Sequence, residues 1–457
     1  MIPNKTEDHL KLPGMQRREC NMNMKISAHS TRGEKTVKIK ITISKIWSKI
    51  KKVKNGVRTV PIKRNKFISI GLVSLLLLLQ TSCWDKAEVE ELAIVVAIAL
   101  DKSEINNVRV TLQVINPKGV ASGGGGGMGG GDKKATAYLN ISNNGKTIFD
   151  AVRAMGSTVP RKLYFSHNQV IIISEELARD GLLDLIDFFN RNPEIRRNNW
   201  LLISKSDVNQ YHLLDAPNPI ELVPAQRITG IIKDEQRSVA YAINQLGDFT
   251  ELFSTPGTDA YTAAIHLVPD VTKEEKMKVI NISHTALFNR DKLVGWLNER
   301  ESRGLLWISK KISDAAINIP MGEKEKYATI STVRSSFNMK PYITEEGQVI
   351  MDIEVKARGS ISETDVYIDL SKPENIKKLE NKMANQIQKD IILAVEKAQK
   401  VNSDVFKFGA AVHRQYPEFW QKIGGNWDQI YPTVEVSVQV DAKISRTGLI
   451  SKPLRVK

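Results

Sequence analysis

The residue with the most specific chemistry in this sequence is Cys83, which follows an apolar run and two small side chains. Residues 67–79 form a run of 13 residues without a charge. A membrane-spanning helix needs about 20 apolar residues, so this run fits the apolar region of a secretory signal instead. Basic residues within 63–66 precede it. Cleavage between Ser82 and Cys83 would free an N-terminal cysteine whose thiol can carry a diacylglycerol, as in a bacterial lipoprotein.

Gln80 departs from the usual lipoprotein signal, which carries Leu three residues before the cysteine. An uncleaved anchor or a buried cysteine are the alternatives to a lipoprotein. The chain contains two cysteines, and Cys20 lies upstream of the expected cleavage. The mature protein would therefore contain no disulfide and would be stabilised by its core alone.

The basic charge of the chain is concentrated before the apolar run. The whole chain has a formal net charge of +15. Residues 1–66 hold 18 Lys and Arg against 4 Asp and Glu, whereas residues 83–457 hold 48 against 47. Because the expected mature chain is nearly neutral, we do not expect nucleic acid as a partner.

Residues 1–66 are much longer than the basic region of an ordinary signal. One explanation is a start codon assigned too far upstream, with Val57 or Val60 as the true initiator. The other is a basic arm on the cytoplasmic leaflet of the membrane, where each Lys or Arg contributes about 1 kcal/mol.

The glycine-rich stretch does not indicate a nucleotide site. Nine glycines lie within residues 119–131, and a GKT sequence follows at residues 145–147. A phosphate-binding loop requires a glycine five residues before the GKT glycine, and that position is Asn140. Glycine has too much backbone freedom to hold one conformation cheaply, so we expect a flexible hairpin loop.

No other pattern indicates an active site, and we expect neither an enzyme nor a cofactor. The mature chain contains no G-x-S-x-G sequence, and its histidines do not have the spacing of metal ligands. These histidines are His167, His212, His266, His284 and His413. The basic segment 191–197, "RNPEIRR", is interpreted as a loop between a helix and a strand, with an acidic partner as the alternative.

The elements expected after Cys83 alternate between strands and helices. A buried strand is expected before Asp101 and an alternating one over 108–115, as a hairpin. Thr147 can cap a helix, and Ile376 to Ala398 has the clearest helical spacing of apolar residues. Further strands are expected in "NQVIIIS", "NNWLLISK", "VIMDIEVKARGSIS" and "TVEVSVQVDAKIS", and a helix is expected to follow the turn at Arg290–Asp291 and run past Leu297.

This pattern predicts an α+β, multidomain protein with sheets packed by helices. We expect a basic extension over 1–66, the signal over 67–82, an N-terminal α/β region over 83–270, and a C-terminal α/β region over 280–457 that divides near residue 330.

Long blocks of the chain resemble the Ger(x)C family of spore germination lipoproteins, the C subunits of germinant receptors. The first block is "SCWDKAEVEELAIVVAIALDK". It is followed by "GKTIFDAVR", "PRKLYFSHNQVIIISEELARDG", "DFFNRNPEIRRNNWLLIS", "TALFNRDKLVGWLNERESRGLLWI", and two blocks between 404 and 450 that begin "DVFKFGAAVHRQ" and "NWDQIYPTVEV". These blocks extend over almost the whole expected mature chain.

The resemblance implies a fold of three mixed α/β domains and a role in spore germination. Such a protein would be anchored by acylated Cys83 on the outer face of the spore inner membrane. It would assemble with integral-membrane A and B subunits into a receptor for small nutrients, without enzymatic activity. Direct binding of a small molecule is left open.

Two other classes of protein remain. A solute-binding lipoprotein would capture the germinant itself in a cleft lined by a few polar groups. A cell-wall enzyme would need a pair of catalytic carboxylates, for which the sequence offers no candidate.

Overall fold

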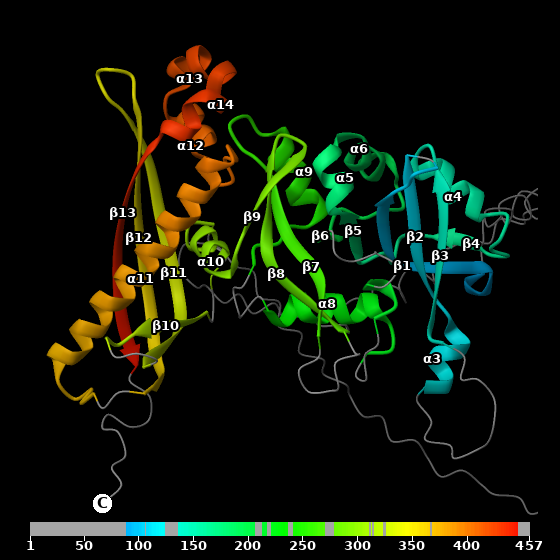
Figure 1. The fold of residues 1–457 in the computed structure, drawn as a ribbon, viewed down its shortest axis with the longest axis horizontal. Coiled ribbons are helices and arrows are strands. Elements are labelled where there is room, and N and C mark those ends of the chain that lie inside the picture. Colours follow the sequence, from blue (N-terminus) through cyan, green and yellow to red (C-terminus); the bar gives the residue numbers. More distant parts are fainter. Residues whose placement is uncertain are drawn as a thin grey trace, which may run out of the picture. The chain divides into compact units, whose positions relative to one another are not determined.

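The computed structural model describes most of the chain after residue 87 (Figure 1). The described residues are 88–105, 107–123, 136–205, 213–216, 221–235, 241–269, 278–309, 312, 315–322, 326–365 and 368–446. Ser82, Cys83 and the expected signal lie outside them, as does most of the glycine-rich stretch. The first residues of that stretch end α3 (Pro117–Gly123).

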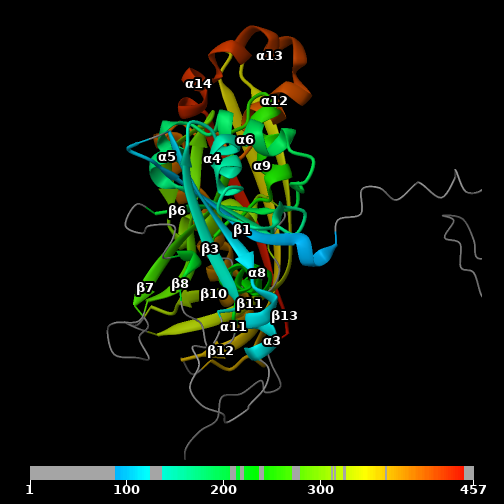
Figure 2. The ribbon, with the colours of Figure 1, turned by 90° about the vertical axis from the view of Figure 1, so that its right-hand side faces the viewer.

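A mixed sheet of nine strands dominates the first part of the described chain, and β1–β3 lie side by side in it (Figures 1 and 2). The order is β3-β2-β1-β5-β6-β7-β8-β9, with β4 beside β1. The strands are β1 (Leu92–Lys102), β2 (Val108–Ile115), β3 (Tyr138–Gly145), β4 (Lys162–Tyr164), β5 (Val170–Ser174), β6 (Trp200–Ser204), β7 (Tyr261–Pro269), β8 (Lys278–Asn289) and β9 (Lys292–Leu297). A 3-10 turn, η2 (Val89–Glu91), leads into β1.

The larger sheet changes from parallel to antiparallel pairing at β1 and again at β7. β1 pairs antiparallel with β2 and parallel with β4 and β5. Its residues from Val95 to Leu100 are all buried, as the continuous apolar run predicts. The expected hairpin of β1 and β2 is confirmed.

Helices cover both faces of this sheet. Successive residues of a strand point to opposite faces, so Ile171 and Ile173 of β5 pack in one apolar cluster and Val170 and Ile172 in another. The first cluster includes residues of α4 (Ile148–Met155), α6 (Leu183–Arg191) and α9 (Leu246–Ser254), and the second includes residues of α8 (Pro224–Glu235). A short helix, α5 (Glu175–Asp180), follows β5 directly.

The expected cap of α4 is present. The Thr147 hydroxyl accepts a hydrogen bond from the Asp150 amide at 3.2 Å. Ile148 and Met155 are buried on one face of the helix, and Phe149 is left exposed on another. The cap therefore fixes both where α4 begins and which residues face the solvent.

The prediction of a helix directly after the turn at Arg290–Asp291 was wrong. The segment is β9, which pairs antiparallel with β8, and the helix α10 (Glu299–Trp307) begins only after Asn298. Asn298 forms a capping box with Glu301, which fixes the start of the helix at this point. The apolar residues of β9 are as compatible with a short strand as with a helical turn, and pairing with β8 decides between them.

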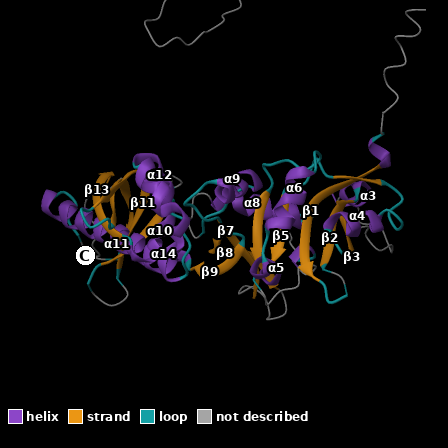
Figure 3. Ribbon diagram, turned by 90° about the horizontal axis from the view of Figure 1, so that it is seen from above, coloured by secondary structure: helices purple, strands orange, loops and turns teal. Residues whose placement is uncertain are grey.

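The second sheet has the strand order β10-β11-β12-β13, and the two sheets account for the strands of the described residues. Its strands are β10 (Ala316–Pro320), β11 (Tyr327–Ile343), β12 (Val349–Thr364) and β13 (Glu435–Arg446). The expected long helix is confirmed as α11 (Pro373–Lys400), which lies along this sheet (Figure 3). Short helices separate α11 from β13, namely α12 (Phe408–Gln415), α13 (Pro417–Ile423), η3 (Gly424–Asn426), α14 (Trp427–Ile430) and η4 (Tyr431–Thr433).

The mixed α/β fold that the sequence predicts is confirmed. The domain boundary between residues 270 and 280 stays a prediction, and the larger sheet continues across it because β8 pairs with β7. No helix among the described residues combines the length and the apolar character needed to cross a membrane.

The contact between α10 and α11 is unusually close because a glycine faces the backbone of α11. A Cβ atom on Gly304 would lie 2.0 Å from the Asp390 carbonyl oxygen. The Asp390 side chain is fully buried, and it accepts hydrogen bonds from Arg300 at 2.6 Å and Arg303 at 2.8 Å. Two cations from α10 thus neutralise the carboxylate of α11.

We predict that Gly304→Ala lowers the free energy of unfolding by about 3 kcal/mol, because the two helices must separate to admit the methyl group. Gly230→Ala in α8 is the matched control, since a Cβ there meets nothing within 4 Å. It should instead raise stability by up to about 1 kcal/mol through helix propensity. Urea denaturation measures both, and equal effects would contradict the close helix contact.

Candidate functional site

An open groove of about 1110 Å³ lies beside the start of the larger sheet. It is formed by α4, the segment from Gly156 to Phe165 that includes β4, and the end of α6 with the loop after it. Phe149 and Val152 of α4 and Phe188 of α6 supply apolar surface. Segments far apart in the chain therefore meet here.

Cations surround this apolar surface. Arg153, Arg161, Lys162 and Arg191 line the groove, against the single carboxylate of Glu194. Arg153 lies over the Phe149 ring, 5.5 Å from its centroid, while Arg191 is paired with Asp187 at 2.6 Å. The basic side chains of the groove can bind an anion beside its apolar surface.

The basic segment 191–197 begins at the last residue of α6 and continues in the loop that leads to β6. Its first residues belong to the groove. Arg197 instead donates to the Gly247 carbonyl oxygen at 3.3 Å. The predicted loop is confirmed, and an acidic partner for it stays a prediction.

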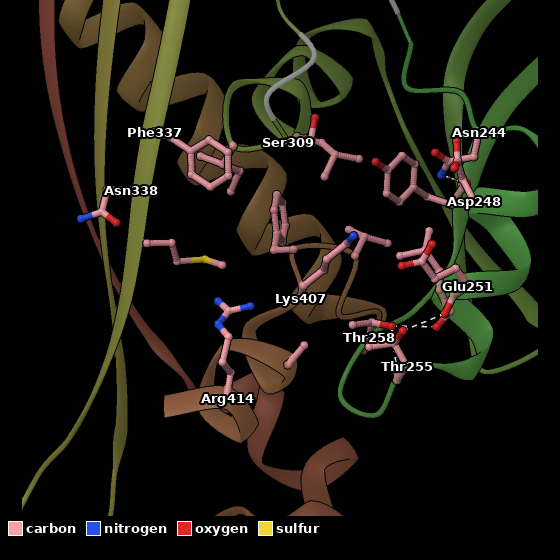
Figure 4. A pocket seen from close by; sticks show the side chains of 18 residues that line it. Asn244, Asp248, Glu251, Thr255, Thr258, Ser309, Phe337, Asn338, Lys407 and Arg414 are labelled. Atoms are coloured by element: carbon pink, nitrogen blue, oxygen red, sulfur yellow. Dashed lines mark hydrogen bonds between the residues drawn. The ribbon is translucent and has the colours of Figure 1, made fainter. Parts of the chain in front are cut away.

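A second pocket, of about 640 Å³, lies between α9, β11 and the segment that begins α12 (Figure 4). Its wall carries Asp248 and Glu251 of α9, while Lys407 and Arg414 extend into it from the other side. Apolar residues including Phe337, Met339 and Phe406 complete the lining. Acidic and basic side chains thus face the same pocket.

Two buried carboxylates lie next to this pocket and hold the C-terminal helices in place. Asp404 accepts hydrogen bonds from the Phe408 amide at 2.9 Å, the Gly409 amide at 2.8 Å and the Trp427 indole at 2.9 Å. Asp259 accepts from the amides of Asp404 at 2.7 Å and Arg290 at 2.8 Å. The pair links the segment just before β7 to the segment that follows α11.

Burial dominates the titration of this pair. Removal from water raises the pKa of Asp404 to about 7, although the amide and indole donors favour its charged form. Burial likewise raises the pKa of Asp259 to about 6, against the two amides that it accepts from. The negative charge of Asp259 also raises the pKa of Asp404, and the negative charge of Asp428 raises the pKa of Asp259.

The comparisons with known proteins match both parts of the chain to one family. Residues 85–267 match the family model described as spore germination protein N-terminal domain. Residues 283–448 match the model described as spore germination B3/GerAC like, C-terminal. The chain belongs to the GerAC family of spore germination proteins. The family resemblance seen in the sequence blocks is confirmed.

Known members of this family are similar over most of the chain. Spore germination protein KC of Bacillus subtilis (strain 168) is 26% identical over 401 residues, covering 84% of this chain and 97% of the relative. Spore germination protein B3 of the same organism is 24% identical, covering 82% of this chain and 97% of the relative. The solved structure titled "Crystal Structure of the GerBC protein" is 21% identical with a TM-score of 0.48, covering 76% of this chain and 96% of that chain.

The histidines of this GerAC-family chain do not gather into one site. His167 lies beside the Tyr164 ring at 5.7 Å and His413 stacks on Trp420 at 5.4 Å. His266 and His284 are neighbours, with ring centroids 6.1 Å apart, and burial lowers the pKa of His284. His212 lies outside the described residues. Within the part that the structure describes, no three His, Cys, Asp or Glu side chains are placed to hold a metal ion.

The sequence did not predict the pair of Asp259 and Asp404, the pocket between α9 and α12, or the groove. Asp404 precedes the amides it binds by four and five residues, whereas the side chain of an ordinary helix cap binds amides two or three residues ahead. Its partner Asp259 is 145 residues away. The groove joins three segments of the family blocks, but no spacing in the sequence places those segments together.

We predict that Asp404→Ala lowers the free energy of unfolding by about 4 kcal/mol, because it leaves three buried donors without an acceptor. Asp404→Asn, which keeps an accepting oxygen and the side-chain volume, should cost less than half as much. Thermal or urea denaturation compares the two variants. Equal losses would show that the hydrogen bonds to the carboxylate do not hold this region.

We also predict that the pair makes stability fall as pH rises from about 4 to about 7. An unfolded Asp loses its proton near pH 4, whereas the folded chain keeps these protons up to pH values of about 6 and 7. The folded state binds more protons in this window, so the free energy of unfolding decreases with pH. The decrease between pH 5 and 8, measured by urea denaturation, should be smaller in Asp404→Asn. An unchanged pH dependence would contradict the raised pKa.

Proposed function

We propose that this protein is the membrane-anchored C subunit of a nutrient germinant receptor and is needed to assemble that receptor. Family membership is the observation that carries the proposal, because matches to both family models cover most of the chain after Cys83. The relatives are spore germination proteins by name. The protein acts through contacts with integral-membrane A and B subunits and not through catalysis.

The proposed anchor is the thiol of Cys83, acylated after cleavage behind Ser82. One acyl chain holds a protein at a membrane only marginally, at about 0.8 kcal/mol per buried CH₂, whereas two chains hold it firmly. Anchoring on the outer face of the spore inner membrane confines the folded chain to the surface where its partners lie. Confinement of this kind raises the effective concentration of partners towards about the millimolar range.

We predict that Cys83→Ala fails to restore nutrient-triggered germination to spores that lack this protein, because the unanchored chain no longer reaches its partners at sufficient concentration. Cys20→Ala is the matched control, since this cysteine lies upstream of the proposed cleavage, and it should restore germination fully. Loss of optical density after nutrient addition and the protein content of the membrane fraction are the measurements. Normal germination with Cys83→Ala would contradict the proposal.

A second function, direct capture of a germinant, is favoured by the pocket between α9 and α12. Carboxylates on one side and cations on the other match the ammonium and carboxylate groups of a small zwitterion such as an amino acid. The volume of about 640 Å³ falls within the range of small-molecule sites.

Calorimetric titration of the mature protein with amino acids tests this second function. Binding should weaken at least tenfold in Arg414→Gln, because a charged hydrogen bond to the carboxylate contributes about 1.5 kcal/mol or more. Arg358→Gln, on an exposed position of β12, is the control and should bind normally. The absence of binding heat in the native protein would rule out capture of these ligands.

A further inference from the structure

We propose that the groove formed by α4, β4 and the end of α6 is a docking surface for the anionic lipid headgroups of the membrane to which the protein is tethered. This inference rests on the proposed acylation of Cys83 and goes beyond it. The anchor by itself fixes only a point of attachment, whereas the groove would fix which face of the protein meets the bilayer.

The first support is the composition of the rim. The side chains of Arg153, Arg161 and Lys162 are exposed and line the same groove. Among the described residues no carboxylate forms an ion pair with any of them, although ten other ion pairs are present. Three cations that form no ion pair with any described carboxylate attract the phosphates of a membrane surface.

The second support is an apolar group at the same place. Phe149 is 57% exposed although it is a large hydrophobic residue, and its ring lies under the Arg153 guanidinium. An aromatic ring flanked by cations is suited to the interface between headgroups and acyl chains. Neither group is needed for the core, because α4 already buries Ile148 and Met155.

The third support is the distance from the anchor. Glu88 is the first described residue and stands five residues after Cys83, so the chain between them spans at most about 18 Å. From there η2 leads into β1, whose first residues Leu92 and Ala93 pair with Lys162 and Leu163 of β4. The short chain between Cys83 and Glu88 therefore places the groove, and not the second sheet, near the membrane surface.

These observations favour a lipid surface over an acidic protein segment as the occupant. The proposed anchor at Cys83 would hold a bilayer close to the cations of the groove, and a bilayer with anionic lipids carries the complementary charge. The groove is also open, with its cations exposed at the edge and Glu194 engaged with the Phe165 amide at 3.4 Å. Such a rim contacts an extended surface without needing a partner of defined shape.

Hydrogen exchange of the acylated mature protein, which starts at Cys83, on vesicles tests the proposal. The protein is bound to vesicles of phosphatidylcholine alone or of equimolar phosphatidylcholine and phosphatidylglycerol, and exchange is followed in 149–163 and 188–194. We expect protection of both segments on the anionic vesicles only. The protection should disappear in 1 M salt, where charges are screened over about 3 Å. Equal exchange on the two kinds of vesicle would overturn the proposal.

Charge variants identify the surface. The mature chain that starts at position 83 and carries Cys83→Ala has neither an acyl chain nor the basic residues 1–66. In this chain, Arg153→Gln with Arg161→Gln and Lys162→Gln should weaken sedimentation with anionic vesicles about 100-fold. The matched control removes three exposed cations from the second sheet, by Arg334→Gln, Lys356→Gln and Arg358→Gln. It should sediment like its parent, and an equal loss in the control would overturn the proposal.

Different results would contradict the acyl anchor at Cys83 and the lipid docking surface at the groove. If the acylated protein is not retained on neutral vesicles, the anchor is wrong, and the sedimentation of the Cys83→Ala proteins still decides the groove. If the groove segments become protected only when the membrane subunits are added, the occupant is a protein segment and the lipid docking surface is wrong.

Discussion

The position of β1 is the constraint on which the rest of the structure depends. This strand is buried from Val95 to Leu100 and pairs with strands on both sides. Its antiparallel pairing with β2 allows a simple hairpin, whereas its parallel pairing with β5 requires the chain to cross over through α4. The same crossover contains β4 and two of the three segments that line the groove. A strand near the proposed anchor thus fixes both the larger sheet and the surface beside it.

The second half of the chain is fixed by charge as well as by apolar packing. Asp390 ties α11 to α10 through two arginines, and Asp404 ties the short helices to the end of α11. Buried carboxylates are costly unless they are paired or hydrogen-bonded, and both of these are. Their partners lie on other helices, so these helices must be in place together before either carboxylate has its hydrogen bonds.

The close approaches at glycines have the same consequence. A Cβ atom on Gly257 would lie 2.6 Å from Gly409, and one on Gly409 would lie 2.7 Å from the Trp427 indole nitrogen. Backbone and aromatic rings therefore meet without intervening side chains next to Asp404. The pocket between α9 and α12 is formed by the same junction, so its two charged walls are held at a fixed separation.

Much of the fold could be predicted because its signals are local. The alternation in β2 and β13, the apolar run of β1 and the spacing in α11 each depend on neighbouring residues. β9 was mistaken for helix because its few apolar residues suit both structures, and only pairing with β8 distinguishes them. Asp259 and Asp404 could not be predicted as a pair, because their contact spans 145 residues and their sequence surroundings are ordinary. The groove was missed for the same reason.

The proposed role connects these features through the tether. The acyl group on Cys83 would hold the protein at the bilayer close to β1. The second sheet and the pocket between α9 and α12 lie farther along the chain. Contacts with the membrane subunits would then be made by surfaces whose orientation is already restricted. The intact mass of the N-terminal peptide, isolated from the membrane of purified spores, tests this account most directly. The account predicts Cys83 as the first residue, with the added mass of a diacylglycerol. A peptide that still carries residues 1–82 would contradict it.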